Sequence, residues 1–191
     1  VGYQAAYSTT TDGENTAVGS RAFYSNTTGN RNVAIGRDAL YSNTTADGNV
    51  AVGYASLDAN TTAEGNTAVG FYSLSGNTTG TSNTALGFQA LYANTTASSN
   101  TAVGYQAAYS NTTGATNTAL GQWSLYDNTS GSNNVAIGRD ALQNNTTAVR
   151  NTAVGYQAGY SVATGSYNVL IGDEAGKDLT VYSSTFVGSA A

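Results

Sequence analysis

The chain has 191 residues, which is enough for one domain of ordinary size. It carries 6 basic and 11 acidic residues, a formal net charge of −5, so it lacks a phosphate-neutralising surface and we expect no nucleic acid partner. Without histidine or cysteine it also lacks the commonest general base, thiol nucleophile and zinc ligands. No apolar run approaches the roughly 18 residues of a membrane span. We therefore expect no enzyme, no cofactor and no metal site.

One unit of 17 residues repeats along the chain. Its marker is a glycine that follows a small apolar triplet and recurs every 17 residues, at Gly2, Gly19, Gly36, Gly53, Gly70, Gly87, Gly104, Gly121, Gly138, Gly155 and Gly172. A short period without slippage predicts a solenoid or fibre. A disordered tract rich in Gly, Ser, Thr and Asn would not keep the triplet in phase. Positions within a unit are numbered from the marker glycine, position 1, to position 17.

Positions 15 to 17 predict a short strand, as in the sequence Val50, Ala51, Val52. Side chains two apart share a face, so positions 15 and 17 lie on one face and the alanine of position 16 on the other. Both faces are apolar, which is not expected of a strand with one face in water. We interpret one face as the core of the coil and the alanine face as packing against a second body, such as an oligomer axis. Positions 4 and 5, as at Ala39 and Leu40, predict a second inner stripe.

These patterns predict an all-β solenoid of about eleven coils. With a spacing of about 4.8 Å, eleven coils make a rod roughly 50 Å long. Residues 1–171 form the regular array, and 172–191 are either a divergent final repeat or the start of another module, because Leu170 and Phe186 stand where other units have alanine. Since the chain opens inside a unit, at Val1, we expect it to be part of a longer fibre.

Asparagine at position 14 predicts a structural ladder, with a ligand-binding role as the alternative. An amide supplies both a donor and an acceptor, so it can bond its neighbour and the turn backbone together. The residues are Asn15, Asn32, Asn49, Asn66, Asn83, Asn100, Asn117, Asn134, Asn151 and Asn168.

The stretches NTAVGYQAAYSNTTG, NVAIGRDALYSNTTADGN and NVAIGRDALQNNTT resemble the head repeats of trimeric autotransporter adhesins and related repeats of phage tail fibres. The resemblance extends over essentially the whole chain, although the unit here is longer in its Leu-Tyr-Ser-Asn-Thr-Thr half. It implies a left-handed β-roll, three chains wound around one axis, and an extracellular location on a cell or virion.

Position 8 begins an Asn-Thr-Thr or Asn-Thr-Ser sequon in most units. The eight candidate glycosylation sites are Asn26, Asn43, Asn60, Asn77, Asn94, Asn111, Asn128 and Asn145. One interpretation is a column of N-linked glycans on one face of the rod. The other is a turn ladder held by side-chain to backbone hydrogen bonds, which is favoured by the crowding of sugars only about 4.8 Å apart.

The leading functional interpretation is an extracellular structural rod, such as the head or shaft of an adhesin, a tail fibre or a surface filament. Its expected partner is itself, as a homotrimer or filament, with glycans and host-surface carbohydrate as further candidates. One alternative is a carbohydrate- or receptor-binding face made from the tyrosine and Asn-Thr ladders. A second is ice binding, for which adjacent threonines would leave only one column facing outward.

Overall fold

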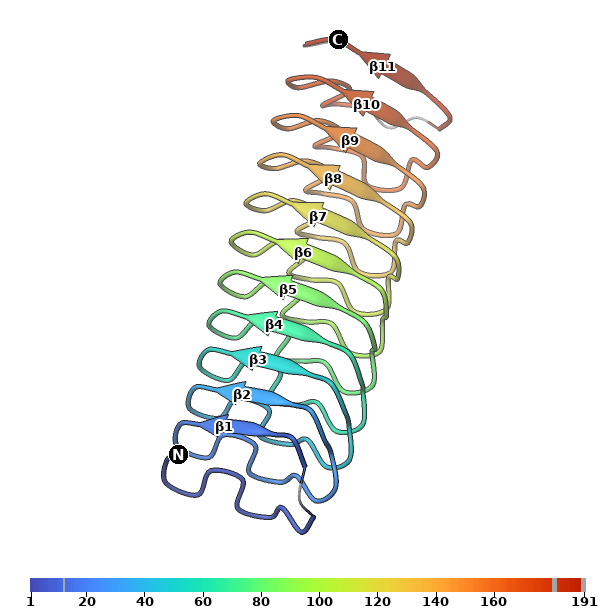
Figure 1. Cartoon of the computed structure of the whole chain (residues 1–191). Helices are drawn as coiled ribbons and strands as arrows, with labels where there is room; N and C mark the ends of the chain where they lie inside the picture. Colours follow the sequence, from blue (N-terminus) through green and yellow to red (C-terminus); the bar gives the residue numbers. More distant parts are fainter. Residues whose placement is uncertain (12, 180–181, 190–191) are drawn as a thin grey trace.

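The computed structural model describes residues 1–11, 13–179 and 182–189, and it is a β-solenoid whose coils stack along one axis (Figure 1). The described residues form strands and turns without a helix. The strands are β1 (Thr16–Val18), β2 (Val33–Ile35), β3 (Val50–Val52), β4 (Thr67–Val69), β5 (Thr84–Leu86), β6 (Thr101–Val103), β7 (Thr118–Leu120), β8 (Val135–Ile137), β9 (Thr152–Val154), β10 (Val169–Ile171) and β11 (Thr185–Val187).

All eleven strands lie side by side in chain order and pair in parallel. The pairing joins equivalent positions of successive units, so Ala51 of β3 lies opposite Ala68 of β4. The last pair keeps this register, with Leu170 of β10 opposite Phe186 of β11. The structure therefore confirms the predicted all-β solenoid, with one coil per 17 residues from β1 to β10 and a last coil one residue shorter.

The turn half of each coil is also bonded to its neighbours. The amide of Leu57 donates to the carbonyl of Ser73 in the next coil at 3.0 Å, and the amide of Gly53 donates to Ile35 in the preceding coil at 2.8 Å. Backbone polar groups are thus satisfied between coils around the whole cross-section, as burial requires. Stacking, rather than the single coil, stabilises the rod.

The alanine of position 16 points into its own coil. Ala51 is 0% exposed, and so is Leu40 at position 5, so the predicted inner stripe at positions 4 and 5 is confirmed. The prediction that the alanine face contacts a second body is wrong. The interior of each coil holds about one large side chain. The leucine of the turn fills that space, so the strand residue that faces it must have a small side chain.

In the divergent coil near the C-terminus, the large core side chain comes from the strand and the turn residue is small. Position 16 is Leu170, which is fully buried, and position 5 is glycine on both sides of it, at Gly159 and Gly176. A Cβ added to Gly159 would lie 2.6 Å from Leu170 Cδ1, and one added to Gly176 would lie 2.7 Å from Leu170 Cδ2. The large side chain has moved from the turn to the strand, while β10 stays in register.

Several non-glycine residues of each turn adopt the left-handed conformation, including Asp38 (φ 60°) and Leu40 (φ 51°). Such a conformation costs roughly 1–2 kcal/mol per residue. The cost is offset by coil-to-coil bonding, since the Leu40 amide donates to Ser56 at 3.0 Å. The marker glycine is required for a different reason. At Gly104 φ is +141°, and an added Cβ would lie 2.6 Å from the carbonyl oxygen of Gly121.

Candidate functional site

The outward strand face carries a continuous apolar column at position 17. Leu86 and Leu120 are 45% and 44% exposed, which is high for large apolar side chains. We call this set the valine column: Val18, Ile35, Val52, Val69, Leu86, Val103, Leu120, Ile137, Val154, Ile171 and Val187. The threonines and valines of position 15 share the same face. A polar solenoid surface therefore has one apolar stripe along its whole length.

The position 14 asparagines lie inside the rod. Nine of them are buried, and Asn15 in the first coil is half-buried. Asn49 is typical, because its Nδ2 donates to the carbonyl of Ala63 at 2.9 Å and its Oδ1 accepts the amide of Asn66 at 2.9 Å. Each side chain links its own coil to the next one.

The sequon asparagines of position 8 form a second buried ladder. All eight are 0% exposed. Asn94 Nδ2 donates to Asn77 Oδ1 at 2.8 Å and to the carbonyl of Ala97 at 3.0 Å, so both of its hydrogens are used. A sugar on Nδ2 would replace one hydrogen and would need space that the coils fill. The geometry therefore favours the interpretation of Asn-Thr-Thr as a structural ladder over the glycan column.

This second ladder ends where the sequence pattern changes. Val162 occupies position 8 of its coil and is fully buried. Asn145 Oδ1, which would accept a bond from an asparagine there, is buried without a hydrogen-bond partner. The substitution visible in the sequence therefore leaves an unsatisfied acceptor in the structure.

The two threonines of the sequon behave differently. The first threonine is hydrogen-bonded to the next coil, as at Thr44, whose Oγ1 donates to the carbonyl of Thr61 at 3.1 Å. The second is exposed in every coil that has it, as at Thr45 and Thr96. A single threonine column thus faces outward from this segment, as the adjacent spacing predicts.

The aromatic side chains stack along the rod axis. Tyr7, Tyr24 and Tyr41 at position 6 have successive centroid distances of 5.2 and 5.1 Å and nearly parallel rings. Phe71 and Phe88 at position 2 stack at 5.3 Å in the same way. Because ring faces cover one another, solvent meets mainly their edges. Each such pair contributes roughly 0.5–1.5 kcal/mol, and a continuous stack offers few open faces to a sugar.

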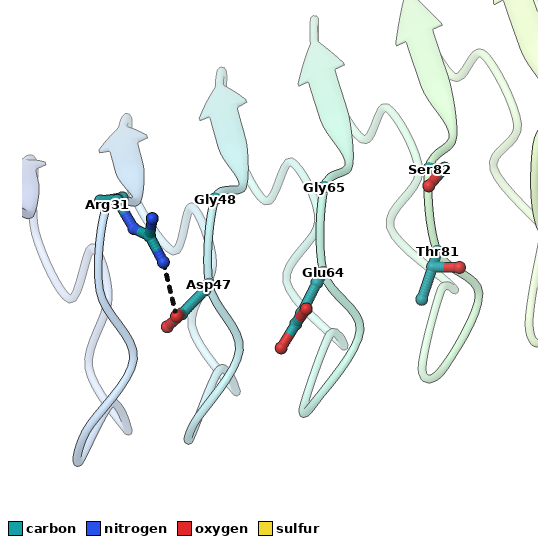
Figure 2. Close-up of a pocket in the computed structure, with 7 residues that line it drawn as sticks. All are labelled: Arg31, Asp47, Gly48, Glu64, Gly65, Thr81 and Ser82. Carbon is teal, nitrogen blue, oxygen red and sulfur yellow. Dashed lines mark hydrogen bonds and ion pairs between the residues drawn. The ribbon is translucent and has the colours of Figure 1, made fainter.

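One open hollow crosses four coils and is shown in Figure 2. It exists because position 13 is glycine at Gly48 and Gly65, where the flanking coils carry Arg31 and Ser82. Its volume is about 520 Å³. Arg31 Nη2 lies 3.2 Å from Asp47 Oδ2, with the arginine side chain exposed and the aspartate side chain partly exposed. An exposed pair of this kind contributes roughly 0–1 kcal/mol, and the hollow shows no convergent set of groups.

A smaller pocket of about 270 Å³ interrupts the tyrosine stack. We call it the Tyr41 pocket; its lining is Arg21, Asp38, Tyr41, Tyr54, Ala55, Asp58 and Tyr72. The stack ends at Tyr41 because the next residue at position 6 is Asp58, and the floor is open because position 3 is Ala55.

Polar groups converge in the Tyr41 pocket. Arg21 Nε lies 2.8 Å from Asp38 Oδ1, and Ser75 Oγ donates to Asp58 Oδ1 at 2.6 Å. Burial raises the pKa of the Asp58 carboxyl, although the bond from Ser75 acts in the opposite direction. The arrangement combines three tyrosine rings, the ion pairs that Asp38 makes with Arg21 and Arg37, and one half-buried carboxyl group.

Comparisons with protein-family models, with curated proteins and with solved structures found no significant match. Within residues 1–11, 13–179 and 182–189, no group of three or more acidic side chains is placed to hold a metal ion. None of the described segments is a helix long and apolar enough to cross a membrane.

Sequence reasoning missed both the outward position of the valine column and the Tyr41 pocket. The pocket had a visible signal, because Ala55 and Asp58 depart together from the bulky residues common at positions 3 and 6.

Proposed function

We propose that the chain is a structural rod segment that associates with copies of itself along the valine column. The observation that carries this proposal is the unbroken apolar stripe on the outward strand face, with Leu86 at 45% exposure and Leu120 at 44%. A strand three residues wide covers about 10 Å, and eleven coils extend about 50 Å. The stripe therefore measures about 500 Å², which is the size of a functional patch on a monomer.

The same face can be widened by the aromatic column of position 2. Phe71, Phe88 and Tyr105 lie two residues beyond the valine column in their coils and are 40–44% exposed. Apolar side chains in this number are covered when the same stripe of several identical chains meets around one closed symmetry axis. A trimer around one axis is the arrangement we propose, with the valine column, not the alanine column, facing the axis.

In this role the rod holds other parts of a fibre at a distance, and we propose an extracellular location on the basis of its resemblance to adhesin and tail-fibre repeats. Three features support a spacer: the coil-to-coil backbone bonding, the two buried asparagine ladders and the aromatic stacks. All three act along the axis and stiffen the rod.

The test is the oligomeric state of the 191-residue chain in solution. We expect sedimentation to give three times the 19.3 kDa chain mass. Leu120→Lys should yield monomers with an unchanged circular dichroism spectrum, because the side chain is exposed in the single chain. Thr96→Lys, which adds the same charge to the exposed threonine column, should remain trimeric.

A wild-type chain that stays monomeric at about 100 μM, roughly ten times a Kd of about 10 μM, would refute the proposal. A monomer that also produced thermal hysteresis in freezing water would support the ice-binding alternative instead. That outcome would assign the outward threonine and valine columns to ice, not to a second chain.

A further inference from the structure

The stacked aromatic columns offer few open ring faces along most of the rod. The Tyr41 pocket lies where one of these stacks ends. Tyr41 stacks on Tyr24 at 5.1 Å on one side. On the other side the column continues with Asp58, a short polar residue, so no ring stacks there, and the guanidinium carbon of Arg21 lies over the Tyr41 ring at 5.3 Å from its centroid. An aromatic ring without a stacked neighbour on one side can receive the apolar face of a sugar ring, where C–H groups meet the negative face of the π-system.

We propose that the Tyr41 pocket binds one neutral pyranose residue, such as the terminal sugar of a glycan. The ring of Tyr41 supports the sugar, the Asp58 carboxylate accepts bonds from its hydroxyls, and the Arg21–Asp38 pair lies beside the same ring. A carboxylate has about four acceptor sites, so the bond from Ser75 leaves capacity for sugar hydroxyls.

The size and charge of the pocket define the ligand class. Its volume of about 270 Å³ is just below the roughly 300–1,000 Å³ of pockets that hold drug-sized ligands, which fits a single sugar rather than an extended chain. Asp38 pairs with both Arg21 and Arg37, at 2.8 and 3.2 Å, and Asp58 supplies the second acid, so the charges around the pocket balance. A sialic or uronic acid would therefore gain no net attraction, and a neutral hexose or N-acetylhexosamine suits a site without net charge.

The residues that carry this inference, Tyr41 and Asp58, lie at position 6 and differ from the valine column of the strands; only Tyr54 of position 2 borders both surfaces. The two proposals fail separately, because sugar binding and chain mass are measured independently.

The experiment is saturation-transfer NMR with the methyl glycosides of glucose, galactose, mannose and N-acetylglucosamine as probes. We expect at least one to bind the wild-type chain with a Kd of the order of 1 mM, which is ordinary for one small ligand in a shallow site. Asp58→Tyr should continue the stack, fill the pocket and reduce the transfer signal at least tenfold.

Gln143→Tyr is the matched control, because Gln143 interrupts the same column between Tyr126 and Tyr160 without lining the Tyr41 pocket. It should bind the sugar as the wild type does. The proposal is overturned if none of the four glycosides binds, or if Asp58→Tyr binds as well as the wild type. It is also overturned if only the methyl glycoside of sialic acid, added as a fifth probe, gives a signal.

Discussion

Removing one asparagine from the middle of the sequon ladder tests the two central claims about this segment, that it is buried and that it links the coils. Asn94→Ala deletes three hydrogen bonds: from Asn94 Nδ2 to Asn77 Oδ1 at 2.8 Å, from Asn94 Nδ2 to the carbonyl of Ala97 at 3.0 Å, and from Asn111 Nδ2 to Asn94 Oδ1 at 2.9 Å. A typical buried bond contributes roughly 1 kcal/mol net.

The groups left behind differ in their remaining partners. The carbonyl of Ala97 still accepts a bond from Asn83, and Asn111 Nδ2 still donates to Gly114. Asn77 Oδ1 keeps no other bond, and it would resemble the unsatisfied Oδ1 at the natural end of the ladder. Three lost bonds, one of which leaves a buried acceptor unpaired, amount to a loss of about 3–4 kcal/mol in the free energy of unfolding.

The assay is urea denaturation followed by circular dichroism, with Thr96→Ala as the control from the exposed column two residues away. The control should stay within about 0.5 kcal/mol of the wild type. If Asn94→Ala also stayed within that range, the ladder would contribute no net stability and the reasoning would be refuted. A glycan on Asn94 in protein secreted from a eukaryotic host, found by peptide mass mapping of folded material, would refute the burial itself.

Three further outcomes follow from the cross-section of the coil. Gly104→Val should lower the unfolding free energy by at least about 3 kcal/mol, because its Cβ would lie 2.6 Å from the Gly121 oxygen. Gly48→Ser adds a Cβ that meets nothing within 4 Å, so it should cost only the roughly 1–2 kcal/mol of a left-handed residue at φ +67°, and equal denaturation midpoints for the two variants would contradict this. Ala102→Leu should overfill the core and cost about 1–3 kcal/mol without changing the oligomer mass measured by light scattering. Asp58→Asn should raise the melting temperature at pH 7, because burial disfavours the charged carboxylate and so raises its pKa in the folded chain. The gain in melting temperature should vanish as the pH falls through that raised pKa towards the ordinary 3.8, where the wild-type carboxyl is neutral as well. A gain that persisted at pH 3 would argue against burial as the cause.

The repeat period and the strand position were predictable from the sequence because both depend on strict spacing. The marker glycine at Gly104 and the apolar triplet before it place each strand to the residue. The ladder formed by the asparagine at position 14 was predictable as well, since its amide supplies both a donor and an acceptor to every coil.

Which face of the strand points into the coil was not predictable. Both of its faces are apolar, and large residues such as Leu120 are usually buried, yet here the small Ala119 is inside. Two facts decide this, the narrow interior and the leucine of the opposite turn, and neither is visible within the strand itself. The left-handed conformation of Leu40 (φ 51°) was equally hidden, because it is imposed by bonds between coils. The sequon was ambiguous because a glycan acceptor and a ladder residue need the same side chain.

The constant register of the coils also bears on how such a chain changes length. The sequence NVAIGRDAL occurs at residues 32–40 and again at 134–142, around β2 and β8, with the same core contacts at Ala34 and Ala136. Gene segments this similar can recombine out of alignment, which removes or adds whole coils. Each product would still present a complete strand to the next coil, so rods of different length would be reached in single genetic steps without passing through a misfolded intermediate sequence.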